Sequence, residues 1–155
     1  MTSTVPTADG SGATDAERAD RLRHAIARMA RLLRQQDDGD LGATATAALA
    51  SVRMRGPLTL GELAAAEHVA PPTMTKVVEK LEARGFVTRD VDPSDRRVSR
   101  VSSTYEGNRY LEVTRALRTA WLSDRLGELE PQQLEQLPAT IELLEAIIAE
   151  RGTEA

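Results

Sequence analysis

Residues 58–101 read LTLGELAAAEHVAPPTMTKVVEKLEARGFVTRDVDPSDRRVSRV, and this stretch decides the fold. Thr59 and Glu62 have the spacing of a capping box, in which a threonine hydroxyl and a glutamate three residues later satisfy each other's backbone N–H groups. A short helix is therefore predicted to begin near Leu60. The side chains predicted to face inward, from this helix and the turn after it, are Leu63, Ala64 and Val69.

A second helix is predicted after a tight turn at residues 68–70. Pro71 and Pro72 suit the first turn of a helix, where a missing N–H costs nothing, and Gly85 after Arg84 suits a left-handed C-terminal cap. Helical spacing predicts an apolar inward side made of Met74, Val77 and Leu81. It predicts a polar outward side made of Pro72, Thr73, Lys76 and Lys80.

The outward side of this second helix has the chemistry of a helix that lies in a DNA major groove. Lys76 and Lys80 lie one turn apart and can meet phosphates, while Thr73 and Thr75 can reach base edges with hydroxyl and methyl groups. A solvated helix face with two lysines is also common in proteins that bind no DNA. This face alone therefore leaves both interpretations open.

Two β-prone runs follow, at residues 86–91 and 98–101, and flank the charged cluster DPSDRR at 92–97. This arrangement predicts a hairpin with the cluster at its tip. Arg96 and Arg97 at the tip are suited to a minor groove beside the major groove that the helix enters. Asp95 either balances their charge or holds an arginine in a fixed rotamer.

Four pieces of this stretch resemble, in order and spacing, the winged helix-turn-helix of the MarR family of bacterial transcription regulators. They are LTLGELA at 58–64, PPTMTK at 71–76, LEARGFV at 81–87 and DPSDRR at 92–97. The resemblance extends less sharply from Glu17 to Arg151, and the wing motif of the family, an Asp and an Arg two residues apart, falls on Asp95 and Arg97. Two helix openings depart from the Leu-Thr common in the family and read Leu41-Gly42 and Ser103-Thr104.

A length of 155 residues is that of one ordinary domain with a core of its own. The chain has no cysteine, which excludes disulfides, thiolate metal sites, thiol catalysis and the cysteine redox switch used by the peroxide-sensing branch of the resembled family. It lacks a signal-peptide pattern and an apolar run of membrane-spanning length. We therefore expect a cytoplasmic protein with no membrane partner.

The formal net charge of −4 counts at first against nucleic-acid binding, but the charge is unevenly placed. Residues 71–100 hold seven Lys or Arg against five Asp or Glu, a balance of +2, whereas residues 122–155 hold two arginines against eight acids, a balance of −6. Because DNA responds to the local field, this distribution favours contact through residues 71–100.

Residues 1–13 are rich in Ser, Thr, Gly and Pro without an apolar period, which predicts a disordered tail. Residues 14–155 are predicted to form a single domain. Thr14 and Glu17 predict a second capping box at the start of a long helix over 14–36.

An alanine-rich helix is predicted over about residues 44–55 and ends at Gly56-Pro57. Long helices are predicted over 104–151, with a kink near residues 134–137 because Pro138 removes one helical hydrogen bond and clashes with the preceding turn.

The terminal helices 14–36 and 104–151 carry long apolar stripes, which either complete the core of one chain or pair with a second copy. The resemblance implies the second, since the first and last helices of the family interlock between subunits. The stripe of the last helix repeats at steps of three and four, a pattern typical of a helix with a partner helix. The predicted dimerisation residues are Leu22, Ile26, Leu137, Ile141, Leu144 and Ile148.

The predicted fold is mainly α: a winged helix-turn-helix module over 41–103 with a two-stranded β wing, flanked by dimerisation helices. The predicted function is a sequence-specific, ligand-responsive repressor that binds an inverted-repeat operator in double-stranded DNA as a homodimer. The alternative is a winged helix used for protein interaction without operator binding, although protein partners do not require lysines on the helix together with arginines at the wing tip.

Enzymatic function is not expected. His24 and His68 are the two histidines and lack the spacing of a metal site, and no phosphate loop or nucleophile elbow occurs, so no cofactor is predicted. The resemblance implies a small aromatic or anionic effector between the dimerisation helices and the winged helix-turn-helix module. His24 and Arg28, one turn apart, are candidates for an anion and Trp121 for an apolar wall; equally, they form a solvated face and a core tryptophan.

Overall fold

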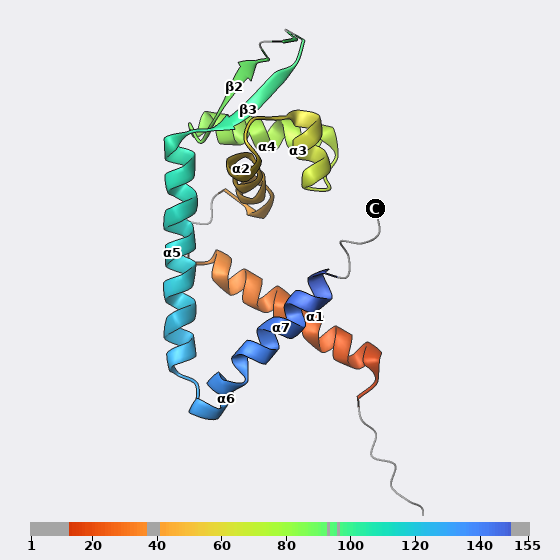
Figure 1. Cartoon of the computed structure of the whole chain (residues 1–155), viewed down its shortest axis with the longest axis vertical. Coiled ribbons are helices and arrows are strands. Elements are labelled where there is room, and N and C mark those ends of the chain that lie inside the picture. The colour runs from red at the N-terminus through yellow and green to blue at the C-terminus, as the bar shows by residue number, and fades with distance from the viewer. Residues whose placement is uncertain (1–12, 37–40, 93, 96, 150–155) are drawn as a thin grey trace, which may run out of the picture.

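The computed structural model describes residues 13–36, 41–92, 94, 95 and 97–149. The helices are α1 (Asp15–Arg34), α2 (Ala43–Arg55), α3 (Leu60–Ala66), α4 (Pro71–Ala83), α5 (Tyr105–Gly127), α6 (Pro131–Glu135) and α7 (Leu137–Ala149). The strands are β1 (Leu58–Thr59), β2 (Val87–Val91) and β3 (Ser99–Ser103). In Figure 1, α5 runs along one side of the molecule and joins a module of α2, α3, α4 and the strands to α1, α6 and α7. The predicted mainly helical fold with a β wing is confirmed.

The predicted wing hairpin is formed by β2 and β3, which pair antiparallel with Val87 opposite Ser103 and Val91 opposite Ser99. A third strand, β1, pairs with the other edge of β3, so the sheet has the order β1-β3-β2 and not the two strands expected. The sequence did not reveal β1 because two residues are too few to show an alternating pattern.

The core lies between α2, α3, α4 and the sheet. From α4, Met74, Val78 and Leu81 are fully buried, whereas Val77 is only half-buried. The prediction that Val77 faces inward is confirmed, because Val77 packs against the core from its edge, whereas the buried Val78 was not among the predicted inward residues. The whole core is Leu41, Ala45, Ala48, Leu49, Val52, Leu63, Ala64, Met74, Val78, Leu81, Val87 and Val101.

Both predicted capping boxes form. Thr59 Oγ1 accepts a hydrogen bond from the N–H of Glu62 at 3.2 Å, and the Glu62 carboxylate accepts one from the N–H of Thr59 at 2.8 Å. Thr14 and Glu17 make the same pair of bonds at the start of α1. At the end of α4, Gly85 has a φ of 70°, the left-handed conformation expected of a C-terminal cap.

The start of α5 is docked on the turn between α4 and β2. The Thr104 hydroxyl accepts from the N–H of Gly107 at 3.0 Å and donates to the carbonyl of Gly85 at 2.6 Å, while the N–H of Thr104 donates to the carbonyl of Phe86 at 3.0 Å. A Cβ on Gly107 would lie 2.2 Å from that Phe86 oxygen. The rings of Phe86 and Tyr110 stack with centroids 4.8 Å apart. These contacts fix α5 to the end of α4.

The last helix is interrupted where Pro138 predicted a kink. Helix α6 ends at Glu135, Gln136 forms a turn, and α7 begins at Leu137. Because Pro138 has no N–H, the carbonyl of Leu134 loses its helical donor at this point.

Residues 1–12 of the predicted tail and residues 150–155 lie outside the described residues. A single domain over 14–155 stays a prediction. Within the described ranges, the helices are too short or too polar to cross a membrane.

Candidate nucleic-acid interface

The side of α4 that was predicted to face outward does so. Pro72, Thr73 and Lys76 are exposed, on the side of the helix opposite its buried residues. Thr75 is half-buried, and its hydroxyl donates to the carbonyl of Pro71 at 3.1 Å, so this hydroxyl is already bonded within the helix.

Lys80, also exposed, connects this face to the start of α2. Its Nζ donates to the carbonyl of Leu41 at 3.2 Å. The N-cap of α2 is Gly42, with a φ of 84° and no side chain to cap the first N–H groups of the helix. Because the N-terminal end of a helix carries partial positive charge, it adds to the field of the lysines beside it. The hollow between α2 and α4 is lined by Leu41, Gly42, Ala43, Thr44, Ala45, Thr73, Lys76, Val77 and Lys80.

At the wing tip the side chain of Arg97 is exposed, and Arg96 lies outside the described residues. Asp95 holds the backbone of the turn: its carboxylate accepts from the N–H of Arg97 at 2.9 Å, and its carbonyl accepts from the N–H of Val98 at 2.9 Å. The support that Asp95 gives the wing thus acts on the backbone before Arg97.

The sequence did not reveal an ion pair at the root of the wing between the buried Asp92 and the half-buried Arg100. Asp92, which is 8% exposed, accepts from Arg100 Nε at 2.5 Å, and from the hydroxyl and the N–H of Ser94 at 2.5 and 2.8 Å. The signal was available in the hairpin register: Arg100 pairs with Asp90, so Asp92, two residues further on the same face, is its diagonal neighbour.

These bonds alter the ionisation of both partners. The hydroxyl of Ser94, the guanidinium of Arg100 and the N–H of Ser94 together hold the pKa of the Asp92 carboxyl far below its usual range. The hydrogen bond to Asp92 in turn raises the pKa of Arg100. Because the folded pKa of Asp92 is lowered, the stability that it contributes is present above its ordinary pKa and is lost as the pH falls through the folded value.

Arg100 is therefore a basic residue of 71–100 that is engaged by acids of the same module. Besides Arg100, Arg89 on β2 lies 3.2 Å from the carboxylate of Glu82 on α4. The described basic side chains that were predicted to meet DNA, Lys76, Lys80 and Arg97, are all exposed. Positive charge thus gathers at the α4 face and the wing tip.

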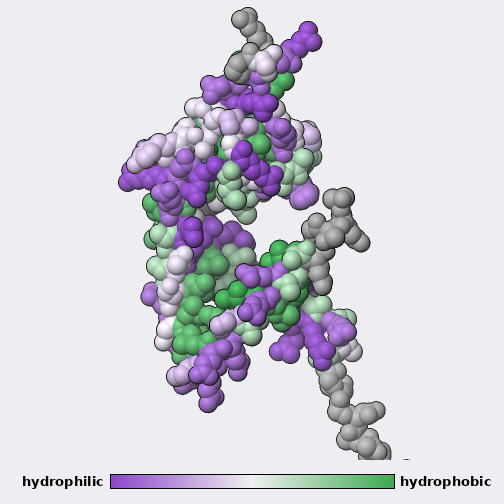
Figure 2. Space-filling model, viewed as in Figure 1, coloured by the Kyte–Doolittle hydropathy of each residue, from purple (hydrophilic) through white to green (hydrophobic). Residues whose placement is uncertain are grey.

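The described part of the chain leaves the apolar stripes of α1 and α7 uncovered. No residue of α1, α6 or α7 is buried among the described residues, and Ile26 and Ile148 are 50% and 72% exposed. Figure 2 shows hydrophobic surface gathered over α1, α7 and the adjoining half of α5, away from the polar wing. Of the other predicted dimerisation residues, Leu22 and Ile141 are exposed and Leu137 and Leu144 half-buried.

The three residues proposed for a ligand have separate surroundings. His24 Nδ1 lies 3.0 Å from the carbonyl oxygen and 3.2 Å from a carboxylate oxygen of Asp20, and Arg28 is exposed. Trp121 is half-buried, and the guanidinium of Arg125 lies 5.6 Å from its ring centroid. That these residues bind one ligand stays a prediction.

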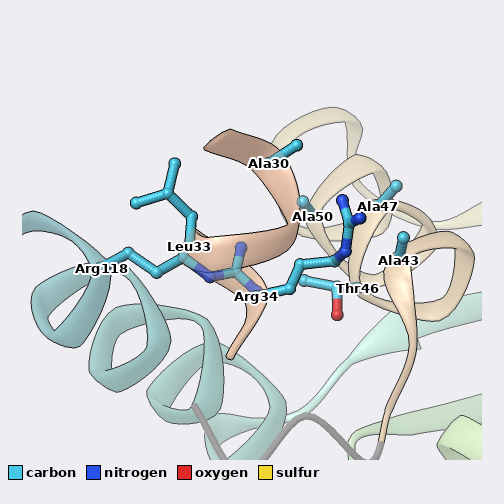
Figure 3. Close-up of a pocket in the computed structure, with 8 residues that line it drawn as sticks. All are labelled: Ala30, Leu33, Arg34, Ala43, Thr46, Ala47, Ala50 and Arg118. Carbon is cyan, nitrogen blue, oxygen red and sulfur yellow. The ribbon is translucent and has the colours of Figure 1, made fainter. Parts of the chain in front are cut away.

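A hollow of about 360 Å³ opens where α1, α2 and α5 meet. In Figure 3, Arg118 from α5 extends toward Arg34 at the end of α1, and the Arg34 side chain extends toward the small side chains of α2. This volume lies at the small end of the range for ligand pockets, roughly 300–1,000 Å³. The lining residues are Ala30, Leu33, Arg34, Ala43, Thr46, Ala47, Ala50 and Arg118.

Residues 41–99 match the model of the MarR family. The chain is 33% identical over 138 residues to the HTH-type transcriptional regulator Mb0904 of Mycobacterium bovis, covering 88% of this chain and 96% of the relative. A putative transcriptional regulator of Pseudomonas aeruginosa has a similar structure (TM-score 0.76, 29% identity, 86% of this chain and 95% of the other). So has BpsR of Bordetella bronchiseptica (TM-score 0.64, 25% identity, 89% and 97%), whose DNA binding is regulated by 6-hydroxynicotinic acid.

Proposed function

This chain belongs to the MarR family of DNA-binding transcriptional regulators, and from that membership we propose that it is a cytoplasmic homodimeric repressor, released from an inverted-repeat operator by a small aromatic acid. The observation that carries the proposal is the exposed basic side of α4 beside an arginine-bearing wing, on a molecule whose terminal helices leave apolar surface uncovered. Two-fold pairing of those helices would place two α4 helices about 34–36 Å apart, in successive major grooves.

In this proposal the residues of the interface have different roles. Lys76, Lys80 and Arg97 meet phosphates or the minor groove and supply affinity for any sequence, as Arg96 does next to Arg97. Pro72, Thr73 and Thr75 near the start of α4 lie against base edges and select the sequence; Thr75 acts through its methyl group, because its hydroxyl is bonded to Pro71.

A selection of bound fragments from random genomic duplexes tests the function directly. The expected result is a recovered motif with two-fold symmetry whose half-sites are centred about one DNA turn apart. Recovery of no enriched motif, or of one without inverted symmetry, would contradict operator binding by a symmetric dimer.

The double variant Lys76→Ala, Arg97→Ala should weaken binding to all duplexes alike. Each lost phosphate contact removes about one unit from the slope of log affinity against log salt, and the homodimer carries each substitution twice, so the slope should fall by about four units. Fluorescence anisotropy across a salt titration measures it, with Arg125→Ala on α5 as a control that removes one exposed arginine from outside the interface. Thr73→Ala should instead change base preference, by about 1–3 kcal/mol per lost contact. An unchanged slope in the folded double variant would show that the interface is misassigned.

The hollow between α1, α2 and α5 suits the proposed effector. Arg34 and Arg118 offer charge for a carboxylate, and Leu33 with the alanines of α2 offers apolar surface for a ring. BpsR, a similar protein regulated by 6-hydroxynicotinic acid, supports the same chemical class. The hollow lies between α1, one of the proposed dimerisation helices, and α2 of the winged helix-turn-helix module. An occupant would therefore alter how the dimerisation helices are placed relative to that module.

The effector and DNA should weaken each other's binding by the same factor. A hundredfold reduction in DNA affinity requires about 2.7 kcal/mol of coupling, and linkage makes the coupling reciprocal. The test is calorimetric titration of 6-hydroxynicotinic acid and of benzoate, with and without the selected operator. The acid that binds should have an affinity about a hundredfold lower when the operator is present. Arg34→Ala should abolish that binding. Equal affinities in the two titrations would mean that the bound acid is no effector.

A further inference from the structure

We propose that Arg100 is a positioning residue for DNA binding: it fastens the wing to the start of α3, and thereby sets the place of the wing arginines relative to α4, without touching DNA. The inference deepens the proposed DNA binding and rests on it. Its starting point is the ion pair at the root of the wing, between Asp92, the first residue of the DPSDRR motif, and Arg100, which lies in none of the four motifs.

The Arg100 side chain joins segments that are distant along the chain. From β3, its Nε donates to the Asp92 carboxylate at 2.5 Å, at the first residue past the end of β2. Its guanidinium also reaches the carbonyl of Pro57 at 3.4 Å, just before β1, and lies 3.7 Å from the carboxylate of Glu62. One side chain therefore contacts Asp92 at the root of the wing, the segment before β1 and the first turn of α3.

Glu62 is itself held in place, which makes it a firm anchor. The carboxylate oxygen of Glu62 that faces Arg100 also accepts from the N–H of Thr59 in the capping box that begins α3. Helix α3 packs on α4, so the start of α3 and the outward side of α4 belong to one packed unit. Arg100 thus connects the wing to the unit that carries the recognition side.

The fastening acts where the sheet stops supporting the wing. The β2–β3 ladder extends to the pair Val91 and Ser99, one further backbone hydrogen bond joins the N–H of Asp92 to the carbonyl of Val98 at 2.8 Å, and the tip that carries Arg97 lies beyond it. An isolated two-stranded hairpin is only marginally stable in water, so without another contact the tip would move relative to α4. Asp92 supplies that contact, because its carboxylate binds the Ser94 turn on one side and Arg100 on the other.

The surroundings of Arg100 also argue against a direct phosphate contact. Its charge is already met by a buried carboxylate and by a second one nearby, and its side chain is 38% exposed. A phosphate would have to compete with Asp92, which would then be left as a buried charge without its cation. Arg97, by contrast, has an exposed side chain and a backbone set by Asp95.

The test compares Arg100→Gln, Asp92→Asn and the double variant with the unmodified protein, on the operator recovered by selection. A positioning role predicts at least a tenfold loss of affinity with an unchanged salt slope, because no phosphate contact is removed. It also predicts that the double variant loses no more than either single variant, since both act through one pair. In the protein without DNA, hydrogen exchange should rise about tenfold or more in all three variants at the amides of residues 92, 94, 97 and 98, which are hydrogen-bonded within the wing.

Two controls separate positioning from general loss of stability. Glu62→Gln keeps the capping box, which accepts Gln as well as Glu, and removes one charge facing Arg100, so it should cost less affinity than Arg100→Gln. Val52→Ala opens a cavity in the core at a residue that makes none of the contacts of Arg100, and it should lower the melting temperature without a tenfold loss of affinity.

Each contrary outcome has a definite meaning. A salt slope reduced by about two units in Arg100→Gln, one for each subunit, would make Arg100 a phosphate contact. Unchanged affinity or unchanged exchange would show that the wing needs no fastening. Either result overturns the inference. An equal affinity loss in Val52→Ala at matched stability overturns it too. If the unmodified protein itself binds no selected duplex, the proposed function has failed, an outcome distinct from failure of the variants alone.

Discussion

Gly107→Ala is expected to destabilise the fold by roughly 3 kcal/mol, at the upper end of the usual cost of overpacking. The added Cβ would lie 2.2 Å from the carbonyl oxygen of Phe86 and 3.1 Å from a methyl carbon of Leu49, and a backbone carbonyl cannot swing aside as a flexible side chain can. The same carbonyl accepts from the N–H of Thr104, so relief of the clash would also loosen the docked start of α5.

The chain offers a matched control for this substitution at the other end of the same helix. A Cβ on Gly127 would meet nothing within 4 Å, so Gly127→Ala should be neutral or gain about 0.5–1 kcal/mol from helix propensity. Urea unfolding of both variants, at one protein concentration because dimerisation adds to apparent stability, measures the difference. Equal stability of the two variants would show that α5 does not cross the α4–β2 turn as closely as described.

Leu144→Glu, Ile148→Glu is expected to break the dimer and with it operator binding. In the proposed homodimer these side chains are buried, so a symmetric interface would take up four carboxylates without partners, each costing several kcal/mol. The dimer dissociation constant should rise by about a thousandfold or more. A monomer engages one half-site, and the loss of bivalent binding should reduce operator affinity by about 10²–10⁴.

Analytical ultracentrifugation at micromolar concentration and operator titration measure these two effects together. Glu142→Gln, on the polar side of α7, is the control and should leave both unchanged. Leu143 and Ile147 are also exposed, at 62% and 48%, which gives α7 apolar surface beyond the predicted stripe and fits a helix enclosed by a second copy. A monomeric unmodified protein at micromolar concentration would exclude the proposed dimer.

Elements that depend on neighbouring residues could be predicted well from the sequence. The capping boxes at Thr14 and Thr59, the left-handed cap at Gly85 and the interruption before Pro138 each arise from groups within four residues of one another, and all four were found as expected. The same holds for the exposed side of α4, because helical periodicity alone places Lys76 on the side of the helix opposite its buried residues.

Contacts between distant segments could not be predicted in this way. Strand β1 exists only because β3 lies beside it, and the hollow between Arg34 and Arg118 exists only because α1, α2 and α5 meet. The sequence places Gly107 within a predicted helix but does not indicate that the carbonyl of Phe86 packs closely against it. Arg100 was counted as part of a basic surface, whereas the structure engages it with Asp92 and Glu62.

The sequence by itself determined the order of the helices and the hairpin, the side of α4 that faces outward and the family resemblance, because these follow from backbone hydrogen bonding and side-chain periodicity over a few residues. The packing of the whole chain, by contrast, sets which charged groups of the module pair with one another and where the helices leave a hollow. Those properties depend on the distances between segments far apart in the chain, and such distances are set by packing of the whole core rather than by any local pattern.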